Sequence, residues 1–356
     1  MPEHPLLSDL TISDVAFGGQ GVARHEGKVV FVPFTVPGEK ITARVRRAKK
    51  AFVEAELVEV TAPSADRVEP ACPYFRRCGG CAYQHIDYAR QLTIKAGQVE
   101  QTIRRLGRLT ETPMRPTEPS PREYAYRNRI RVHVEGGRAG FYAHGSHAIV
   151  EINECVIASP EVNEELRRLR SAMPVDGDYT LFGKSRAEYF EQTNDGAAEA
   201  LLGLVEAAVG QGGGLLVDAY CGAGFFARRL AAKFSKVIGI EENARAVDRA
   251  QRDAAAHERY IAGDVAVHLG EVLSGHDPKT TTVILDPPAA GLAPRVTDLL
   301  LGDQPAVMVY ISCNPATLAR DLGELCRTAY RLESVTPLDM FPQTAEIEVV
   351  AKLVRR

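Results

Sequence analysis

Cys313 is placed where a thiol could act as a nucleophile. It follows the apolar, strand-like run 307–312 and comes directly before an Asn-Pro pair that is typical of a helix start. A thiol beside a helix N-terminus has a pKa below its usual value of about 8.5, because the helix dipole stabilises the thiolate. The spacing therefore predicts a reactive Cys313 at a strand end, whereas Cys221 and Cys326 are interpreted as inert core thiols.

A carboxylate that could remove a proton lies near the end of the chain. Residues 339–351 supply two acids, Glu346 and Glu348, on the same face of a strand-like run. Glu348 enters the apolar part of that run, so we expect it to be partly buried with a raised pKa. Glu348 is therefore the candidate general base.

Four further cysteines have the spacing of metal ligands. Cys72, Cys78 and Cys81 lie within ten residues, and the two glycines before Cys81 allow the backbone to fold tightly. Cys155 is the nearest candidate for a fourth ligand. Four thiolates can hold a tetrahedral zinc ion or an iron–sulfur cluster, and the wide gap after Cys72 favours the cluster. Disulfides are not expected, because the total of seven cysteines is odd.

Residues 200–356 alternate helix and strand patterns, as in a doubly wound α/β domain. An acid before the glycine turn, Asp218, suits a cationic sulfonium better than a pyrophosphate. Glu241 ends the next strand, where it could accept hydrogen bonds from ribose hydroxyls, and Asp264 ends a third, where it could hold an adenine amino group. Asp286, followed by two prolines, marks the reaction side. The pattern favours S-adenosylmethionine over a nicotinamide dinucleotide.

A methyl donor, a thiolate and a carboxylate together predict methylation at carbon 5 of uracil. That carbon is not nucleophilic, but addition of the Cys313 thiolate at carbon 6 gives an enolate that can attack a methyl sulfonium. The proton on carbon 5 must then leave before the thiolate is eliminated, which requires a base such as Glu348 beside the same ring.

The elements that position these residues belong to a chain of 356 residues, long enough for two or three domains. Its 43 Lys and Arg against 46 Asp and Glu give a net charge of −3, and its 45% hydrophobic content excludes disorder, collagen and a coiled coil. The positive charge is concentrated in residues 40–50, with six bases and no acid, and residues 90–131, with ten bases and four acids. Such stretches in an otherwise acidic protein predict contact with a polyanion such as RNA.

The expected architecture is multidomain α/β, with domains at residues 1–62, 63–180 and 181–356. The first is expected to be a small, OB-like RNA-binding β-barrel. Its strands are expected at 9–16, 28–33, 40–46 and 52–60. The second is a central α+β iron–sulfur and RNA-binding domain, with a helix near 88–107 that packs on the catalytic domain. The third is a Rossmann-like, doubly wound methyltransferase domain.

Nearly the whole chain also resembles a known family. Residues 18–39 are similar to a TRAM domain, an RNA-binding barrel fused to some RNA-modifying enzymes. The other matching segments are 72–85, 91–95, 126–129, 190–194, 218–224, 286–288, 312–315 and 341–344, together with Cys155. With these residues the chain resembles the RNA uridine-5 methyltransferases of the RlmD/TrmA type, most closely the ribosomal RNA enzymes that carry a TRAM barrel and an iron–sulfur cluster.

The resemblance implies two cofactors and a set of roles. A [4Fe-4S] cluster would be held by Cys72, Cys78, Cys81 and Cys155. S-adenosyl-L-methionine would contact Gln192, Tyr220, Glu241 and Asp286. Cys313 would be the nucleophile and Glu348 the proton acceptor. The expected partner is structured RNA, 23S ribosomal RNA ahead of transfer RNA.

Three positions depart from the family pattern: Ala289 replaces a usual Arg, Glu346 a usual His, and Phe225 a common Asn. They motivate an alternative, a non-catalytic RNA-binding scaffold, beside that of a transfer RNA uridine-5 methyltransferase. A cytosine-5 methylase ranks third, because Ser312 stands where those enzymes place Pro. We expect a cytoplasmic monomer without obligate protein partner or membrane contact, since no apolar run approaches the ~20 residues that span a bilayer.

Overall fold

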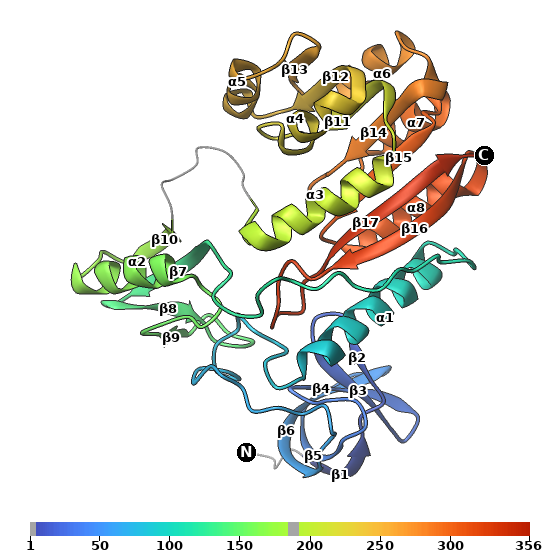
Figure 1. Ribbon diagram of the computed structural model, residues 1–356. Helices are drawn as coiled ribbons and strands as arrows, with labels where there is room; N and C mark the ends of the chain where they lie inside the picture. Colours follow the sequence, from blue (N-terminus) through green and yellow to red (C-terminus); the bar gives the residue numbers. More distant parts are fainter. Residues whose placement is uncertain (1–4, 184–191) are drawn as a thin grey trace. The chain divides into compact units, whose positions relative to one another are not determined.

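The computed structural model describes residues 5–183 and 192–356, which fall into two compact units (Figure 1). The first unit comprises residues 1–98, 121–185 and 341–346, and the second comprises residues 99–120, 186–340 and 347–356. The predicted domain boundaries at residues 62 and 180 stay a prediction, because each of the two units combines separate segments of the chain.

The first unit begins with a six-stranded sheet in the order β1-β5-β6-β4-β3-β2. Its strands are β1 (Leu6–Thr11), β2 (Asp14–Ala16), β3 (Gln20–His25), β4 (Lys28–Pro33), β5 (Lys40–Ala48) and β6 (Phe52–Ala62). Strand β5 has the predicted alternation, because Ile41 and Ala43 are buried while Lys40 and Arg44 are exposed. The buried side chains join a common core with residues of the other strands.

Two details of this sheet differ from the sequence-based prediction. The expected strand at 9–16 is two strands, interrupted at Ile12 and Ser13. Strand β3 is missing from the prediction, because Gly18 and Gly19 indicate a turn and obscure the strand that starts at the next residue. Both glycines have positive φ, 95° and 88°, as a tight turn requires.

A second sheet of the first unit has the strand order β10-β7-β8-β9. Its strands are β7 (Arg129–Glu135), β8 (Arg138–Tyr142), β9 (Ile149–Glu151) and β10 (Gly177–Phe182). Helix α2 (Pro160–Ser171) packs its buried Val162 and Leu166 into the core of this sheet. The helix starts at a serine cap, with the Ser159 hydroxyl accepting from Val162 N at 3.3 Å. The expected α+β arrangement is therefore present between residues 129 and 182.

The basic stretch 90–131 is not exposed at every base, although its predicted contact with a polyanion stays a prediction. Lys95 is fully buried, and its ammonium donates to Phe341 O at 3.1 Å. Arg90 pairs with Asp66 at 3.3 Å, and Arg131 pairs with Asp178. Lys95 is the buried exception because helix α1 (Tyr88–Leu106) turns one face to the interior, whereas most other bases of the stretch remain exposed.

The second unit is built on a seven-stranded sheet in the order β13-β12-β11-β14-β15-β17-β16. Its strands are β11 (Gly213–Ala219), β12 (Phe234–Glu241), β13 (Glu258–Ala262), β14 (Thr281–Leu285), β15 (Val307–Ser312), β16 (Tyr330–Leu338) and β17 (Glu348–Arg355). The two pairings of β17, with β15 and with β16, are antiparallel, and the other strand pairs described in this sheet are parallel. This is the doubly wound α/β architecture that the alternating pattern predicts.

Helices cover both faces of this sheet (Figure 1). They are α3 (Asp195–Val209), α4 (Phe225–Leu230), α5 (Ala244–Arg252), α6 (Val265–Ser274), α7 (Pro294–Asp303) and α8 (Pro315–Thr328). Helices α6, α7 and α8 share one apolar core with the sheet, and Val99 and Ile103 from the end of α1 belong to the same core. None of the helices within residues 5–183 and 192–356 is long and apolar enough to cross a membrane.

Candidate active site

The predicted site residues lie at one edge of the seven-stranded sheet. Strands β11 to β15 are parallel, so their carboxyl ends share an edge, and α/β active sites form there. Each strand brings a predicted residue to this edge: Asp218 in β11, Glu241 at the end of β12, Asp264 after β13, Asp286 after β14 and Cys313 after β15. Strand order, which the sequence does not specify, is what brings these distant residues to the same place.

Glu348 reaches the same edge from the antiparallel strand. Ser312 pairs with Val349 across β15 and β17, so Cys313 and Glu348 are the next residues beyond this antiparallel pair. Glu348 is 5% exposed, whereas Glu346 is exposed to solvent. The expectation that Glu348 is the buried acid of the two is confirmed.

The turn after β15 presents Cys313 as predicted. Cys313 is exposed, and Asn314 caps helix α8, its Oδ1 accepting from Ala316 N at 3.0 Å. Pro315 takes the first helical position, where its missing N–H costs nothing. An accessible thiol beside a fourteen-residue helix N-terminus is a suitable nucleophile. The other two thiols of this unit, Cys221 and Cys326, are buried as expected.

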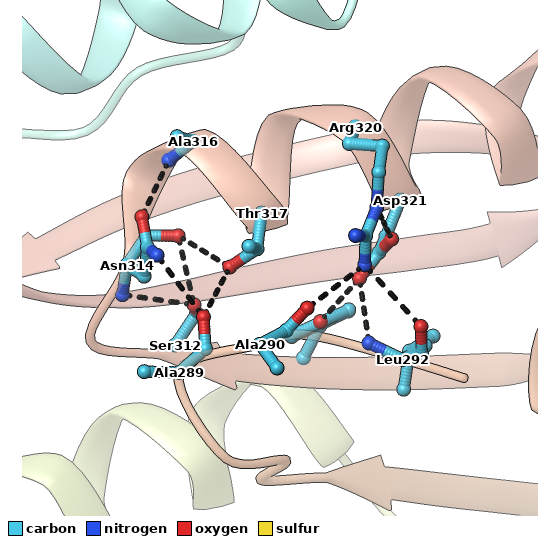
Figure 2. Close-up of polar contacts among 10 residues, drawn as sticks. Ala289, Ala290, Leu292, Ser312, Asn314, Ala316, Thr317, Arg320 and Asp321 are labelled. Carbon is cyan, nitrogen blue, oxygen red and sulfur yellow. Dashed lines mark hydrogen bonds and ion pairs between the residues drawn. The ribbon is translucent and has the colours of Figure 1, made fainter.

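The loop after Asp286 is fastened to this helix (Figure 2). Asn314 Nδ2 and Thr317 Oγ1 both donate to Ala289 O, at 3.0 and 3.1 Å. Arg320 Nη2 donates to the carbonyl oxygens of Ala290 and Leu292, at 3.1 and 3.2 Å. The loop that carries the methyl-donor candidate Asp286 and the helix that follows the thiol therefore form one hydrogen-bonded assembly.

Asp321 secures the far end of the same loop from within the core. It is buried, and its Oδ2 accepts from Leu292 N at 2.9 Å and from Tyr310 Oη at 2.7 Å, while its Oδ1 pairs with Arg320. Gly291 lies between these groups with a φ of 77°, and a Cβ there would come within 2.7 Å of Asp321 Oδ2. Sequence reasoning assigned no role to Asn314, Thr317, Arg320 or Asp321, although Asn before Pro is a helix-cap signal.

Two carboxylates at this edge are protonated more readily than usual. Asp218 is fully buried, and burial raises its pKa to about 7, with the neighbouring Asp286 and Glu241 adding to the increase. Burial likewise raises the pKa of Asp286 to about 7. Asp218 Oδ2 accepts from Ala227 N at 2.8 Å, whereas Oδ1 has no hydrogen-bond partner among the described residues. A cationic ligand near this pair would stabilise its ionised form.

The glycine turn after β11 is held by Glu241. One carboxylate oxygen accepts from Gly222 N at 3.0 Å and the other from Asn243 N at 2.8 Å. Tyr220 adopts a left-handed backbone, with a φ of 68°, at the start of the turn. Burial, with help from Asp264 and Asp321, raises the pKa of Tyr220 to about 12, so the phenol stays neutral and can donate a hydrogen bond.

Asp264 and Gln192 complete the predicted methyl-donor set. Asp264 caps helix α6, its Oδ1 accepting from Ala266 N at 2.8 Å, and it lies close enough to affect the Tyr220 phenol. Gln192 is half-buried just before Asn194, the cap of helix α3. The first residues of the motif at 190–194, Phe190 and Glu191, lie outside the described residues.

The four predicted ligand cysteines lie in the first unit and are all reduced and partly exposed. Burial is the largest cause of the rise in the pKa of Cys81 to about 12, and the nearby Cys155, Cys78 and Cys72 add to it. Gln84 connects two of them, because its Oε1 accepts from Cys72 N at 3.0 Å and its amide lowers the pKa of Cys81. The structure thus brings all four thiols into one neighbourhood.

A metal site is not shown by this arrangement. Within residues 5–183 and 192–356, no group of three or more His, Cys, Asp or Glu side chains is arranged to hold a metal ion. The donor chemistry nevertheless fits an iron–sulfur cluster, which takes four cysteine sulfurs and amide N–H groups directed at sulfur. Gly80 N already donates to Cys78 Sγ at 3.4 Å.

Comparisons with known proteins agree with this architecture. A family model described as tRNA (Uracil-5-)-methyltransferase matches residues 271–356, and a TRAM domain model matches residues 8–58. An uncharacterized RNA methyltransferase of Bdellovibrio bacteriovorus is 38% identical over 381 residues, which cover 98% of this chain and 96% of that protein. An uncharacterized RNA methyltransferase of Thermosynechococcus vestitus is 30% identical over 439 residues, covering 97% of each.

A solved structure extends the likeness to both units. The crystal structure of Pyrococcus abyssi tRNA (uracil-54, C5)-methyltransferase in complex with S-adenosyl-L-homocysteine matches 97% of this chain and 100% of its own, with a TM-score of 0.72 and 25% identity. Fold and site thus define an S-adenosylmethionine-dependent RNA methyltransferase with an N-terminal TRAM domain. The chain belongs to the RNA uridine-5 methyltransferase family.

Proposed function

We propose that the protein methylates carbon 5 of a uridine in 23S ribosomal RNA through a covalent adduct with Cys313. The observation that supports this proposal is the pairing of Ser312 with Val349, because the exposed Cys313 and the buried Glu348 are the residues next to that pair. A uracil methylase needs these two groups on the same ring, because the thiolate must add at carbon 6 and a base must take the proton from carbon 5.

S-adenosylmethionine would occupy the edge formed by β11, β12 and β14. Glu241 and Tyr220 would hold its ribose and adenine side, and Asp264 would contact the adenine amino group. Asp286, with Gln192, would face the methionine part. When bound, this cofactor supplies an electrophilic methyl group. The chain's own contribution is to orient the ring, to supply the thiolate and to accept the proton.

The four cysteines of the first unit would hold a [4Fe-4S] cluster, with Cys72, Cys78, Cys81 and Cys155 as ligands. The mutual effect of the four thiols on the pKa of Cys81 and the contact of Gly80 N with Cys78 Sγ support this assignment. The exposed bases Lys40, Arg44 and Arg47 of the TRAM domain would supply attraction to phosphates. The protein would act in the cytoplasm as a monomer.

A methyl-transfer assay with two RNAs tests the substrate. The purified protein and labelled S-adenosylmethionine are incubated with unmodified 23S ribosomal RNA and, separately, with unmodified transfer RNA. We expect label at carbon 5 of uridine in the ribosomal RNA, and none with the Cys313→Ala variant, because that variant lacks the thiolate that would add at carbon 6. Cys326→Ala, which removes a buried thiol of helix α8, is the matched control.

Transfer RNA is the second candidate substrate, favoured by the likeness to the archaeal tRNA (uracil-54, C5)-methyltransferase. Label on transfer RNA alone would replace the ribosomal proposal with this one. Label on neither RNA, from protein that binds both, would instead support a non-catalytic RNA-binding scaffold.

A further inference from the structure

The segment Phe341–Glu346 connects the two units just before the candidate base. It lies between β16 and β17, both in the second unit, but its own contacts place it in the first unit. It ends two residues before Glu348, which is the first residue of β17. The segment therefore leads directly into Glu348, which the sheet holds through its pairing with Leu338.

Gln343 is the fixed point of the segment. It is buried, and its carbonyl oxygen accepts from Ala82 N at 3.0 Å and Tyr83 N at 2.9 Å. Its φ of 69° is left-handed, which for a residue other than glycine costs about 1–3 kcal/mol and persists only where the surroundings enforce it. Backbone strain of this kind is typical of functional positions.

Gln91 of helix α1 enforces that conformation. Its Nε2 donates to Gln343 Oε1 at 3.0 Å, and its Oε1 accepts from Gln343 N at 3.2 Å. The same Nε2 also donates to Ile86 O at 2.9 Å, so the Gln91 amide is itself held in place. A buried amide that pairs with both the backbone and the side chain of one residue sets its position in two directions.

The two residues before Gln343 are held as well. Lys95 Nζ donates to Phe341 O at 3.1 Å, and Tyr126 Oη donates to Pro342 O at 3.0 Å. Three successive carbonyl groups of the segment thus have partners within the first unit. A connection that only spanned two units would not need this number of buried hydrogen bonds, each worth about 1 kcal/mol.

We propose that Phe341–Glu346 is a strap that positions Glu348 for proton removal, with Gln91 and Gln343 as its positioning residues. This inference rests on the proposed function. The thiolate of Cys313 first bonds to carbon 6, and carbon 5 then takes the methyl group from the sulfonium. Glu348 next removes the proton from carbon 5, the electrons of that C–H bond form the C5–C6 double bond, and the C6–S bond breaks to release the thiolate. Only this last step requires the strap.

A displaced base leaves a distinctive product. In a strap variant the thiol still adds and the methyl group is still transferred, but elimination stalls, so methylated RNA remains covalently attached to the protein. Gln91→Leu removes both hydrogen bonds to Gln343. Gln98→Leu is the matched control, because Gln98 is a buried glutamine on the same helix whose amide donates to Val15 O, Ala16 O and Tyr83 Oη instead.

The experiment measures a denaturant-resistant protein–RNA adduct that carries labelled methyl, together with steady-state turnover. The Glu348→Gln variant is the reference, because its adduct level is the level expected when the proposed base is absent. For Gln91→Leu we expect at least about a tenfold rise in adduct and a similar fall in kcat, with the KM for RNA within about twofold of wild type. Gln98→Leu should match the wild type. Gln343→Gly, which tolerates the positive φ, repeats the test should Gln91→Leu fail to fold.

Two outcomes would overturn the proposal that the strap positions Glu348. One is folded Gln91→Leu or Gln343→Gly protein with wild-type adduct and turnover, and the other is equal adduct levels in the Gln91 and Gln98 variants. Absence of both methylated RNA and adduct from wild type and Glu348→Gln alike would instead refute the proposed function, so the two failures are distinguishable.

Discussion

We expect two neighbouring acids, Asp218 and Asp286, to make binding of S-adenosylmethionine depend on pH. Burial raises the pKa of each to about 7, so near neutral pH the pair holds a proton in the free protein. A sulfonium cation favours the ionised form and lowers these pKa values on binding, so binding releases a proton. We therefore expect the affinity for S-adenosylmethionine to rise with pH up to about 7 and then to level off. The rise should be at most about tenfold per pH unit for each proton released. Calorimetry between pH 6 and 8 measures this.

The Asp218→Asn variant is the control for that prediction. It keeps the shape of the side chain and removes one titrating group, so the dependence on pH should flatten. The free energy of unfolding changes with pH in the opposite direction to the affinity. The folded-state pKa of Asp218 lies above the usual 3.8, so the folded protein binds this proton more tightly than the unfolded chain. The stability that Asp218 contributes is therefore lost as pH rises through about 7. Unfolding of the unliganded protein should therefore show a smaller pH dependence in Asp218→Asn, and an unchanged profile would contradict the assignment.

At the scale of elements, hydrogen bonds from helix α8 hold the loop that follows β14. Arg320 Nη2 holds the carbonyls of Ala290 and Leu292, and its Nε pairs with the buried Asp321. Arg320→Met keeps most of the side-chain stem but loses these bonds, so the loop that carries Asp286 should loosen. We expect about 1–3 kcal/mol lower stability and weaker binding of S-adenosylmethionine, measured by urea unfolding and calorimetry.

Arg327 provides the comparison, because it is exposed in the last turn of the same helix. Arg327→Met should leave both quantities within about 0.5 kcal/mol of wild type. Equal effects of the two substitutions would show that the loop contacts of Arg320 do not matter for the methyl-donor site.

The sequence predicts the ends of the buried strands but not how the strands pair. The buried strand ends at Asp218, Glu241, Asp286 and Cys313 are visible as apolar runs with polar ends, because a parallel strand must bury both faces. The pairing of Ser312 with Val349, next to Cys313 and Glu348, is not visible, since register between distant segments leaves no local pattern. Lys95 shows the opposite failure: a base in a basic stretch predicts exposure, yet a backbone carbonyl satisfies it inside the first unit.

At the scale of the whole molecule, the two units are interleaved along the chain. Helix α1 contributes Gln91 and Lys95 to the first unit, and Val99 and Ile103 to the core of the second. The strap Phe341–Glu346 likewise leaves the second unit and returns to it at Glu348. Neither unit is a continuous stretch of sequence, so a change in the first can reach the proposed catalytic residues of the second through the chain itself.

The cysteine loop provides the test of that connection. Cys81 is followed directly by Ala82 and Tyr83, whose backbone N–H groups bind Gln343 O. If the cysteines hold a cluster, it fixes the loop from which the strap is held. The Cys81→Ala variant should therefore lose iron, measured by metal analysis and visible absorbance, and should also accumulate the methylated protein–RNA adduct seen with Gln91→Leu. Cys326→Ala, a buried thiol outside the loop, should keep both its iron and its turnover. Iron loss without adduct would mean that the cysteine site serves RNA binding or folding, and that the strap is held by Gln91 without it.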